Sequence, residues 1–258
     1  MNHELTFLGT CARDFSPRLE GDCREVFDLD ARRSSCALVD GRYLIDCGTH
    51  TLDSLRIAGV DRNAITDLFV THLHSDHFDR ENIAALAEGR DEPLRVWVRE
   101  GAEHRLPSTV SVRYMTPFTR YEIADGLLLT GMPANHDAKA TPQHLLLELG
   151  EKKLLYACDG AWMLNETYYF LKKANLSVAV LDCTTGDYLG DFRMGEHNSI
   201  PMLRLMLPSM KTWQILSDES RVYLSHIAPS LHKPHAETSE IVREFGATLA
   251  YDGLRIPL

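Results

Sequence analysis

The chain has 258 residues, 44% of them hydrophobic, and a formal net charge of −10 at pH 7. A chain of this length can form one or two domains. We expect one domain over residues 1–258, because no repeat and no linker rich in Pro, Gly or Ser divides the sequence. The negative charge argues against nucleic acid as a partner and against binding to an anionic membrane.

The sequence also indicates a compartment. No apolar run approaches the roughly 20 residues that cross a membrane, and residues 1–5 show no signal-peptide pattern. The six cysteines form no Cys-x-x-Cys pair, and the chain is too long to depend on a disulfide framework. We therefore expect a cytoplasmic protein with reduced thiols at Cys11, Cys23, Cys36, Cys47, Cys158 and Cys183.

The first part of the chain is predicted to open with a strand at residues 4–8, followed by a long polar segment at residues 10–33. Loops of this length are uncommon unless functional, so we expect the segment to border the active site. Asp40-Gly41 between two apolar runs is a strong hairpin signal. The next expected elements are strands at 35–39, 42–45 and 65–70 and helices at 51–58 and 79–87, the last with Asp79 near its N-cap.

The rest of the chain alternates between apolar strands and helices. Residues 110–115 and 120–123 are predicted to be edge strands. Asp252-Gly253 indicates a closing hairpin of residues 248–251 and 254–256. The other expected strands are 94–98, 126–134, 144–149, 153–157, 177–181 and 221–224, and the other expected helices are 166–175, 200–207 and 238–245.

The most informative segment is Thr71-His72-Leu73-His74-Ser75-Asp76-His77, between a predicted strand and a predicted helix. Alternate side chains of an extended segment share a face, so His72 and His74 point the same way. The chain then turns, which lets Asp76 and His77 point into the same space. Three imidazoles and one carboxylate suit a divalent ion of the zinc, manganese or iron type. A solvated polar loop is the alternative interpretation.

Further potential ligands follow other apolar strands. His136, Asp159 and His226 each come directly after a strand, and Asp46 and Asp182 are acids at strand ends. A single histidine in such a place is usually an ordinary loop residue. Together these residues indicate one site, because layered α/β proteins build their sites at the ends of strands.

Counting ligands predicts a centre of two divalent ions, zinc or manganese first and iron second. Two ions about 3.5–4 Å apart can share a hydroxide that is nucleophilic near neutral pH. An acid at the end of a buried strand is costly unless it is paired, so Asp46 is assigned a supporting role behind the ligands. The assignment gives His72, His74 and His136 to one ion, Asp76, His77 and His226 to the other, and Asp159 to both.

The loop at residues 71–77, followed in order by His136, Asp159 and His226, resembles the motifs of the metallo-β-lactamase superfamily. Asp46 matches the first motif of that superfamily, and the resemblance extends from Leu5 to Ile256. It implies an α/β (α+β) fold, a four-layer αββα sandwich with the dinuclear site at one edge. It also implies a metal-dependent hydrolase.

A narrower resemblance rests on Leu181-Asp182-Cys183, Glu196-His197-Asn198, Ser225-His226-Ile227 and Tyr251-Asp252-Gly253. These segments look like those of the phosphodiesterase of the carbon–phosphorus lyase pathway, which opens cyclic ribose phosphates. A histidine at the place of His197 contacts the substrate phosphate there. The resemblance therefore implies that His197 binds the phosphate or protonates the leaving oxygen, and that the protein is a homodimer. A surface-loop histidine is the alternative.

We expect a dinuclear phosphodiesterase that cleaves small cyclic or nucleotide-like phosphate diesters through a metal-bridging hydroxide. Asp76, which orients the hydroxide, and His197 are the expected catalytic residues. His232 is a weaker candidate for substrate binding, with a surface loop as the alternative. Lys139 or Arg193 could pair with a substrate phosphate, although exposed charges rarely bind anything specific.

Three other functions stay open. A nuclease of the tRNA 3′-processing type needs an RNA-gripping arm, for which the interval from His136 to Asp159 is too short. A lactone or thioester hydrolase could use two metals equally well but leaves His197 without a task. A metal-dependent binding module with the same ligands would be no enzyme at all.

Overall fold

The computed structural model describes residues 3–14, 19, 25–124 and 126–258. Among these residues, fourteen strands form two sheets of seven. The strands of the first sheet are, in spatial order, β14 (Arg255–Pro257), β1 (Glu4–Gly9), β2 (Cys36–Val39), β3 (Tyr43–Ile45), β4 (Asp67–Phe69), β5 (Arg95–Arg99) and β6 (Ser111–Met115). Those of the second are β13 (Ala247–Leu249), β12 (Leu216–Ser225), β11 (Leu176–Asp182), β10 (Lys152–Ala157), β9 (Gln143–Leu149), β8 (Leu127–Pro133) and β7 (Arg120–Glu122).

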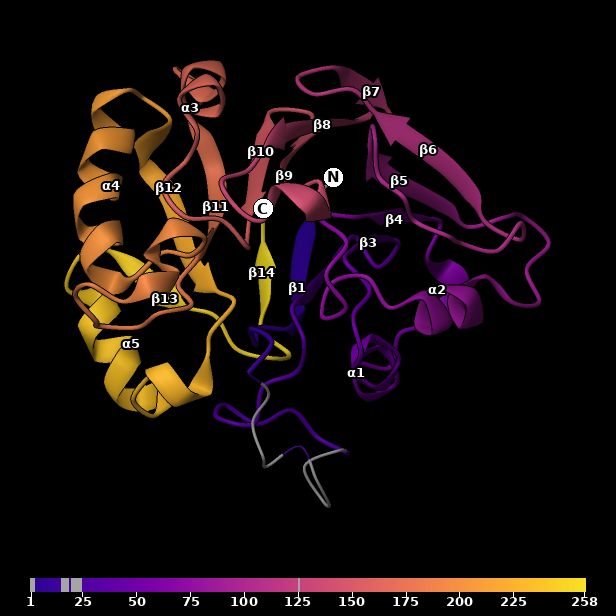
Figure 1. Ribbon diagram of the computed structural model, residues 1–258, viewed down its shortest axis with the longest axis horizontal. Helices are drawn as coiled ribbons and strands as arrows, with labels where there is room; N and C mark the ends of the chain where they lie inside the picture. The colour runs from indigo at the N-terminus through magenta and orange to yellow at the C-terminus, as the bar shows by residue number, and fades with distance from the viewer. Residues whose placement is uncertain (1–2, 15–18, 20–24, 125) are drawn as a thin grey trace.

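Helices cover the outer face of each sheet (Figure 1). An apolar cluster that includes Phe7 and Tyr156 fills the space between the two sheets. A second cluster joins the second sheet to its helices, and a third joins the first sheet to α1 and α2. The α-helices are α1 (Thr51–Ile57), α2 (Arg80–Ala87), α3 (Asn165–Leu171), α4 (Ile200–Thr212) and α5 (His235–Arg243). The layers therefore form the αββα sandwich that the sequence predicted.

Local sequence signals account for several elements. Asp40 and Gly41, the central residues of the turn from Val39 to Arg42, have positive φ angles of 52° and 69°, as type I′ requires. The Asp79 side chain accepts hydrogen bonds from the backbone N–H groups of Glu81 and Asn82 and so caps α2. The strands β6 and β7 lie at the edges of their sheets, as predicted.

Helix α4 is longer than the sequence predicted, because it continues through Pro208 to Thr212. Proline in a helix interior costs about 3 kcal/mol and usually ends the helix. Here Met210, in the turn after the proline, is fully buried in the cluster under the second sheet. Burying its side chain contributes about 1.5–3 kcal/mol and offsets much of that cost.

The closing hairpin was predicted wrongly. The strand β13 pairs in parallel with β12 of the second sheet, whereas β14 pairs antiparallel with β1 of the first. Asp252 holds the crossing between the sheets: its buried carboxylate accepts hydrogen bonds from the Thr10 hydroxyl and the Arg33 backbone N–H, both at 2.7 Å. The chain therefore leaves the second sheet shortly before the Asp252-Gly253 pair and enters the first sheet shortly after it.

Replacing Asp252 with Asn is expected to lower the free energy of unfolding by about 3–5 kcal/mol, because the buried Arg32 and Arg33 lose a nearby negative charge. Denaturation in urea measures this change. Glu151→Gln, in the exposed turn between β9 and β10, is the control and should change stability by less than about 0.5 kcal/mol. Equal stabilities of the two variants would contradict the role of Asp252.

Two sequence expectations concern the chain as a whole. Five cysteines are buried and free, whereas Cys23 lies outside the described residues. Within the described part, every helix is too short or too polar to cross a membrane.

Candidate metal centre

The predicted ligands meet at one edge of the sandwich, each at or just after the carboxyl end of a strand. Residues 71–77 follow β4, and Asp159 follows β10. His136 comes shortly after β8, and His226 comes directly after β12. Asp159 and His226 have positive φ angles of 58°, a strained backbone that is common at functional sites.

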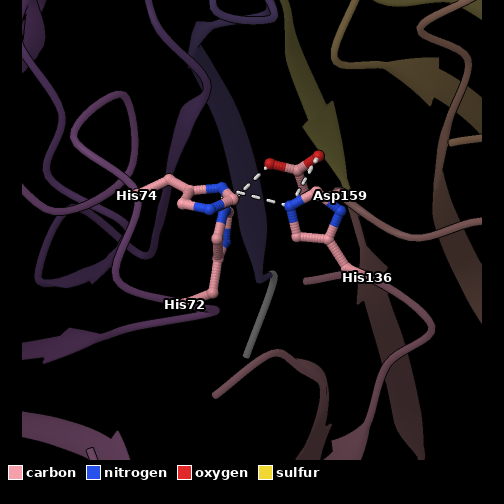
Figure 2. Close-up of side chains that lie close together, drawn as sticks. All are labelled: His72, His74, His136 and Asp159. Carbon is pink, nitrogen blue, oxygen red and sulfur yellow. Dashed lines mark hydrogen bonds and ion pairs between the residues drawn. The ribbon is translucent and has the colours of Figure 1, made fainter. Parts of the chain in front are cut away.

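Four side chains form a first group of donor atoms: His72, His74, His136 and Asp159. The Nδ1 atom of His74 lies 3.0 Å from His72 Nε2 and 3.1 Å from His136 Nε2. The Oδ2 atom of Asp159 lies 3.0 Å from His72 Nε2. Figure 2 shows these side chains converging on one point.

A second group lies beside the first and shares Asp159 with it: Asp76, His77, His226 and Asp159. The Nε2 atoms of His77 and His226 face each other at 3.1 Å. Asp159 Oδ2 lies 3.0 Å from the first of these nitrogens and 3.2 Å from the second. The two groups coincide with the two ligand sets assigned from the sequence, with Asp159 between them.

The donor set fits divalent cations. Nitrogen ligands arranged tetrahedrally around zinc lie about 3.3 Å from one another, close to the spacings here. The facing imidazole nitrogens cannot all carry protons, and burial lowers the pKa of His72 to about 3. Among the described residues, histidines are the only side chains that lie at ion-pair distance from the four buried carboxylates of Asp46, Asp76, Asp159 and Asp182. Two divalent ions would balance these four negative charges.

Asp46 lies behind the ligands rather than among them. Its Oδ2 atom is 2.7 Å from His77 Nδ1, so the opposite nitrogen, Nε2, faces the centre. The same carboxylate accepts hydrogen bonds from the backbone N–H and the hydroxyl of Thr71, both at 2.7 Å. It therefore fixes both the start of the ligand loop and the orientation of one ligand.

Gly48 allows the ligand loop to pack against the chain after β3. A Cβ atom at this position would lie 1.8 Å from the backbone oxygen of Asp76. Gly48→Ala is therefore expected to displace the loop and weaken metal binding by about 10–100-fold or more. Competition with a chelating dye measures the affinity. Gly195→Ala, where a Cβ would meet open space, is the matched control and should bind metal as the unmodified protein does.

Thr184 lies in the site but was not predicted from the sequence. Its hydroxyl lies 2.7 Å from His226 Nδ1, 3.2 Å from His197 Nδ1 and 2.9 Å from Asp182 Oδ2. It thereby orients two imidazoles at once. A signal was present, because Thr184 follows two residues after an acid at the end of a buried strand, where its backbone N–H reaches that acid at 3.1 Å.

His197 lies beside the donor groups and lines a cavity of about 470 Å³. Its Nδ1 atom is 3.0 Å from Asp159 Oδ1 and 3.1 Å from Asp182 Oδ2. Burial lowers the pKa of His197, but the two carboxylates outweigh this effect and raise that pKa to about 9. Nδ1 therefore faces the two carboxylates, and no described residue is paired with the other ring nitrogen, Nε2.

The remaining candidates divide into two groups. Ala12, Arg13 and Asp14 line the cavity, so the long polar segment borders the site as expected, and Arg193 lines it too. Lys139 and His232 are not among the lining residues. The Nε2 atom of His232 lies 2.7 Å from the backbone oxygen of Cys183. His232 lines two neighbouring cavities instead.

A family model described as a beta-lactamase superfamily domain matches residues 41–227. The chain belongs to the metallo-β-lactamase superfamily. The match begins just before Asp46 and ends just after His226, so it spans the donor residues of both groups. Membership confirms the predicted family and sandwich fold, and it confirms a metal-dependent hydrolase at the level of the family.

Two named relatives share part of the sequence. Ribonuclease Z of Methanothermobacter thermautotrophicus is 27% identical over 150 residues, which cover 52% of this chain and 44% of that protein. Human zinc phosphodiesterase ELAC protein 1 is 33% identical over 87 residues, which cover 30% of this chain and 19% of that protein. The matched part is therefore less than half the length of these relatives.

Solved structures share the fold over nearly the whole chain. A diphosphatase from the PhnP family superposes with a TM-score of 0.77 at 19% identity, covering 100% of this chain and 98% of that one. The short form of human tRNase Z superposes with a TM-score of 0.68 at 17% identity, covering 98% of each chain. The expectation that nucleic acid is not a substrate finds no support, since relatives carry the name ribonuclease Z.

Proposed function

We propose that the protein is a dinuclear metal-dependent phosphodiesterase that hydrolyses small cyclic or nucleotide-like phosphate diesters. The observation that carries this proposal is the position of His197, whose ring lines the cavity with Nδ1 3.0 Å from Asp159 Oδ1, next to both donor groups. A histidine in this place can protonate an alkoxide as it leaves phosphorus. The names of the relatives, zinc phosphodiesterase and diphosphatase, support a phosphate ester as the substrate.

In the proposed centre, His72, His74 and His136 would hold one ion, Asp76, His77 and His226 would hold another, and Asp159 could serve both. When bound, two such ions lower the pKa of water and neutralise charge on the phosphoryl oxygens. Zinc or manganese suits these nitrogen and oxygen donors, with iron as the further candidate.

The chain's own residues position the reactants. The Asp76 carboxylate, which lines the cavity, orients the attacking water. As the bond from water to phosphorus forms, the bond to the leaving oxygen breaks, and Nε2 of His197 donates the proton that this oxygen needs. Asp182 stabilises the imidazolium through Nδ1, and the proton released by water restores it.

Hydrolysis assays with the purified, metal-loaded protein test the proposal. We expect cleavage of bis(4-nitrophenyl) phosphate and of a 2′,3′-cyclic nucleotide, both abolished by a chelator and restored by zinc or manganese. The proposal would be overturned if neither substrate were cleaved with zinc, manganese or iron.

A nuclease of the tRNA 3′-processing type is the second candidate, because relatives are named ribonuclease Z. Between His136 and Asp159 the chain forms only a 3₁₀ turn and the hairpin of β9 and β10, with no inserted arm. Incubation with a precursor tRNA discriminates between the two. Cleavage at the 3′ end at rates far above those for cyclic nucleotides would favour the nuclease.

A further inference from the structure

Two arginines line the metal cavity without contacting the donor groups. Arg13 comes from the segment after β1, and Arg193 comes from the turn that precedes His197. The proposed reaction at phosphorus already has two ions and an imidazolium to balance the charge of one phosphodiester. These guanidinium groups are therefore available for a different part of the substrate.

Arg13 is exposed, but its backbone is held on both sides. The Ala12 N–H donates to the backbone oxygen of Ile227 at 2.9 Å. The Asp14 carboxylate accepts from the Ser230 N–H at 3.0 Å through Oδ2. Among the residues that the structure describes, Arg13 has no hydrogen-bond or ion-pair partner. These contacts hold the backbone on either side of Arg13 against the residues that follow His226, which places its positive charge at the cavity.

Arg193 is held more tightly. Its Nη1 atom donates to Asp191 Oδ2 at 2.9 Å, and its guanidinium stacks over the Phe192 ring at 4.7 Å. No described residue accepts a hydrogen bond from Nε or Nη2. The edge of the guanidinium that carries these two nitrogens is therefore available to a ligand. The backbone oxygen of Arg193 also accepts from the His197 N–H at 2.8 Å. This backbone hydrogen bond holds Arg193 about one helical turn before His197, the proposed proton donor.

An anion is the ligand that two guanidinium groups at one cavity select, and phosphate matches the fork by two parallel hydrogen bonds. The cavity also carries the Glu196 carboxylate, which disfavours a long polyanion. We infer that Arg13 and Arg193 form a second anion subsite, which binds a terminal phosphate group of a small substrate. This inference rests on the proposed function and names its substrate class: a phosphodiester with a further phosphate, rather than a bare cyclic diester.

Two ligands that differ only in the terminal phosphate test the subsite without requiring turnover. Titration calorimetry with the metal-loaded protein compares adenosine 3′-phosphate with adenosine 3′,5′-bisphosphate. We expect the bisphosphate to bind about 10–100-fold more tightly, as charged bidentate contacts allow. Arg13→Gln and Arg193→Gln should each remove much of this ratio. Arg193→Lys, which keeps the charge but loses the fork, should retain part of it.

Arg204→Gln is the matched control, because Arg204 pairs with Glu244 at 3.0 Å, away from the cavity, and should leave the ratio unchanged. Equal affinities of the two ligands, or a ratio that survives both glutamine substitutions, would overturn the subsite. Binding of a ten-nucleotide RNA far more tightly than the bisphosphate would also overturn the subsite. A ratio that behaves as expected in a protein that cleaves no phosphodiester would leave the subsite standing and reject the proposed function alone.

Discussion

Replacing Asp159 with Asn is expected to abolish the dinuclear centre and reduce kcat/KM for phosphodiesters by roughly 10³-fold or more. The Oδ2 atom of Asp159 lies within 3.2 Å of a ring nitrogen of each of His72, His77 and His226. An amide in its place removes one negative charge and turns one of the two oxygens into an N–H donor that cannot bind a cation. The side-chain volume barely changes, so the effect reports on charge and coordination.

Metal content after dialysis, measured by mass spectrometry, should fall from two ions per chain to one or none. Asp218→Asn provides the control, because this carboxylate on β12 is 99% exposed and far from the centre. It should keep both ions and full activity. Two ions bound with unchanged affinity by the Asp159 variant would show that this residue does not bridge the metals.

The sequence was sufficient to predict which donor residues lie together, for a physical reason. Each ligand follows an apolar strand, and the strand pattern alone places strand ends at one edge of a layered fold. The loop at 71–77 contributes four donors whose relative positions depend only on local geometry. Long-range contacts were therefore needed only to bring three single residues, His136, Asp159 and His226, to that loop.

Features that depend on contacts between distant segments could not be predicted in this way. The strained φ angles of Asp159 and His226 hold these side chains in place, yet no local motif requires them. Thr184 acts through residues 13 and 42 positions away, so its role is visible only in the fold. The prediction of a closing hairpin was wrong for the same reason. Asp252 accepts a hydrogen bond from Thr10, which is 242 positions away, and this contact directs the chain to the other sheet.

His197→Ala is expected to reduce kcat by about 10²–10⁴-fold for substrates with an alkoxide leaving group, such as a 2′,3′-cyclic nucleotide. An alkoxide needs a proton as the bond to phosphorus breaks, and His197, beside both donor groups, is the proposed donor of that proton. For bis(4-nitrophenyl) phosphate the loss should be much smaller, since 4-nitrophenolate leaves without protonation.

The ratio of the two losses distinguishes the possible roles of His197. Equal losses on both substrates would show that it binds the phosphate rather than protonating the leaving oxygen. Metal content should stay at two ions, because the two ligand sets assigned to the ions do not include His197. His104→Ala is the matched control: this histidine contacts Tyr114 at 2.9 Å away from the cavity, and its loss should change neither rate. Lactone hydrolysis that persists in the His197 variant, in a protein inert toward phosphodiesters, would instead favour carbonyl chemistry at the same centre.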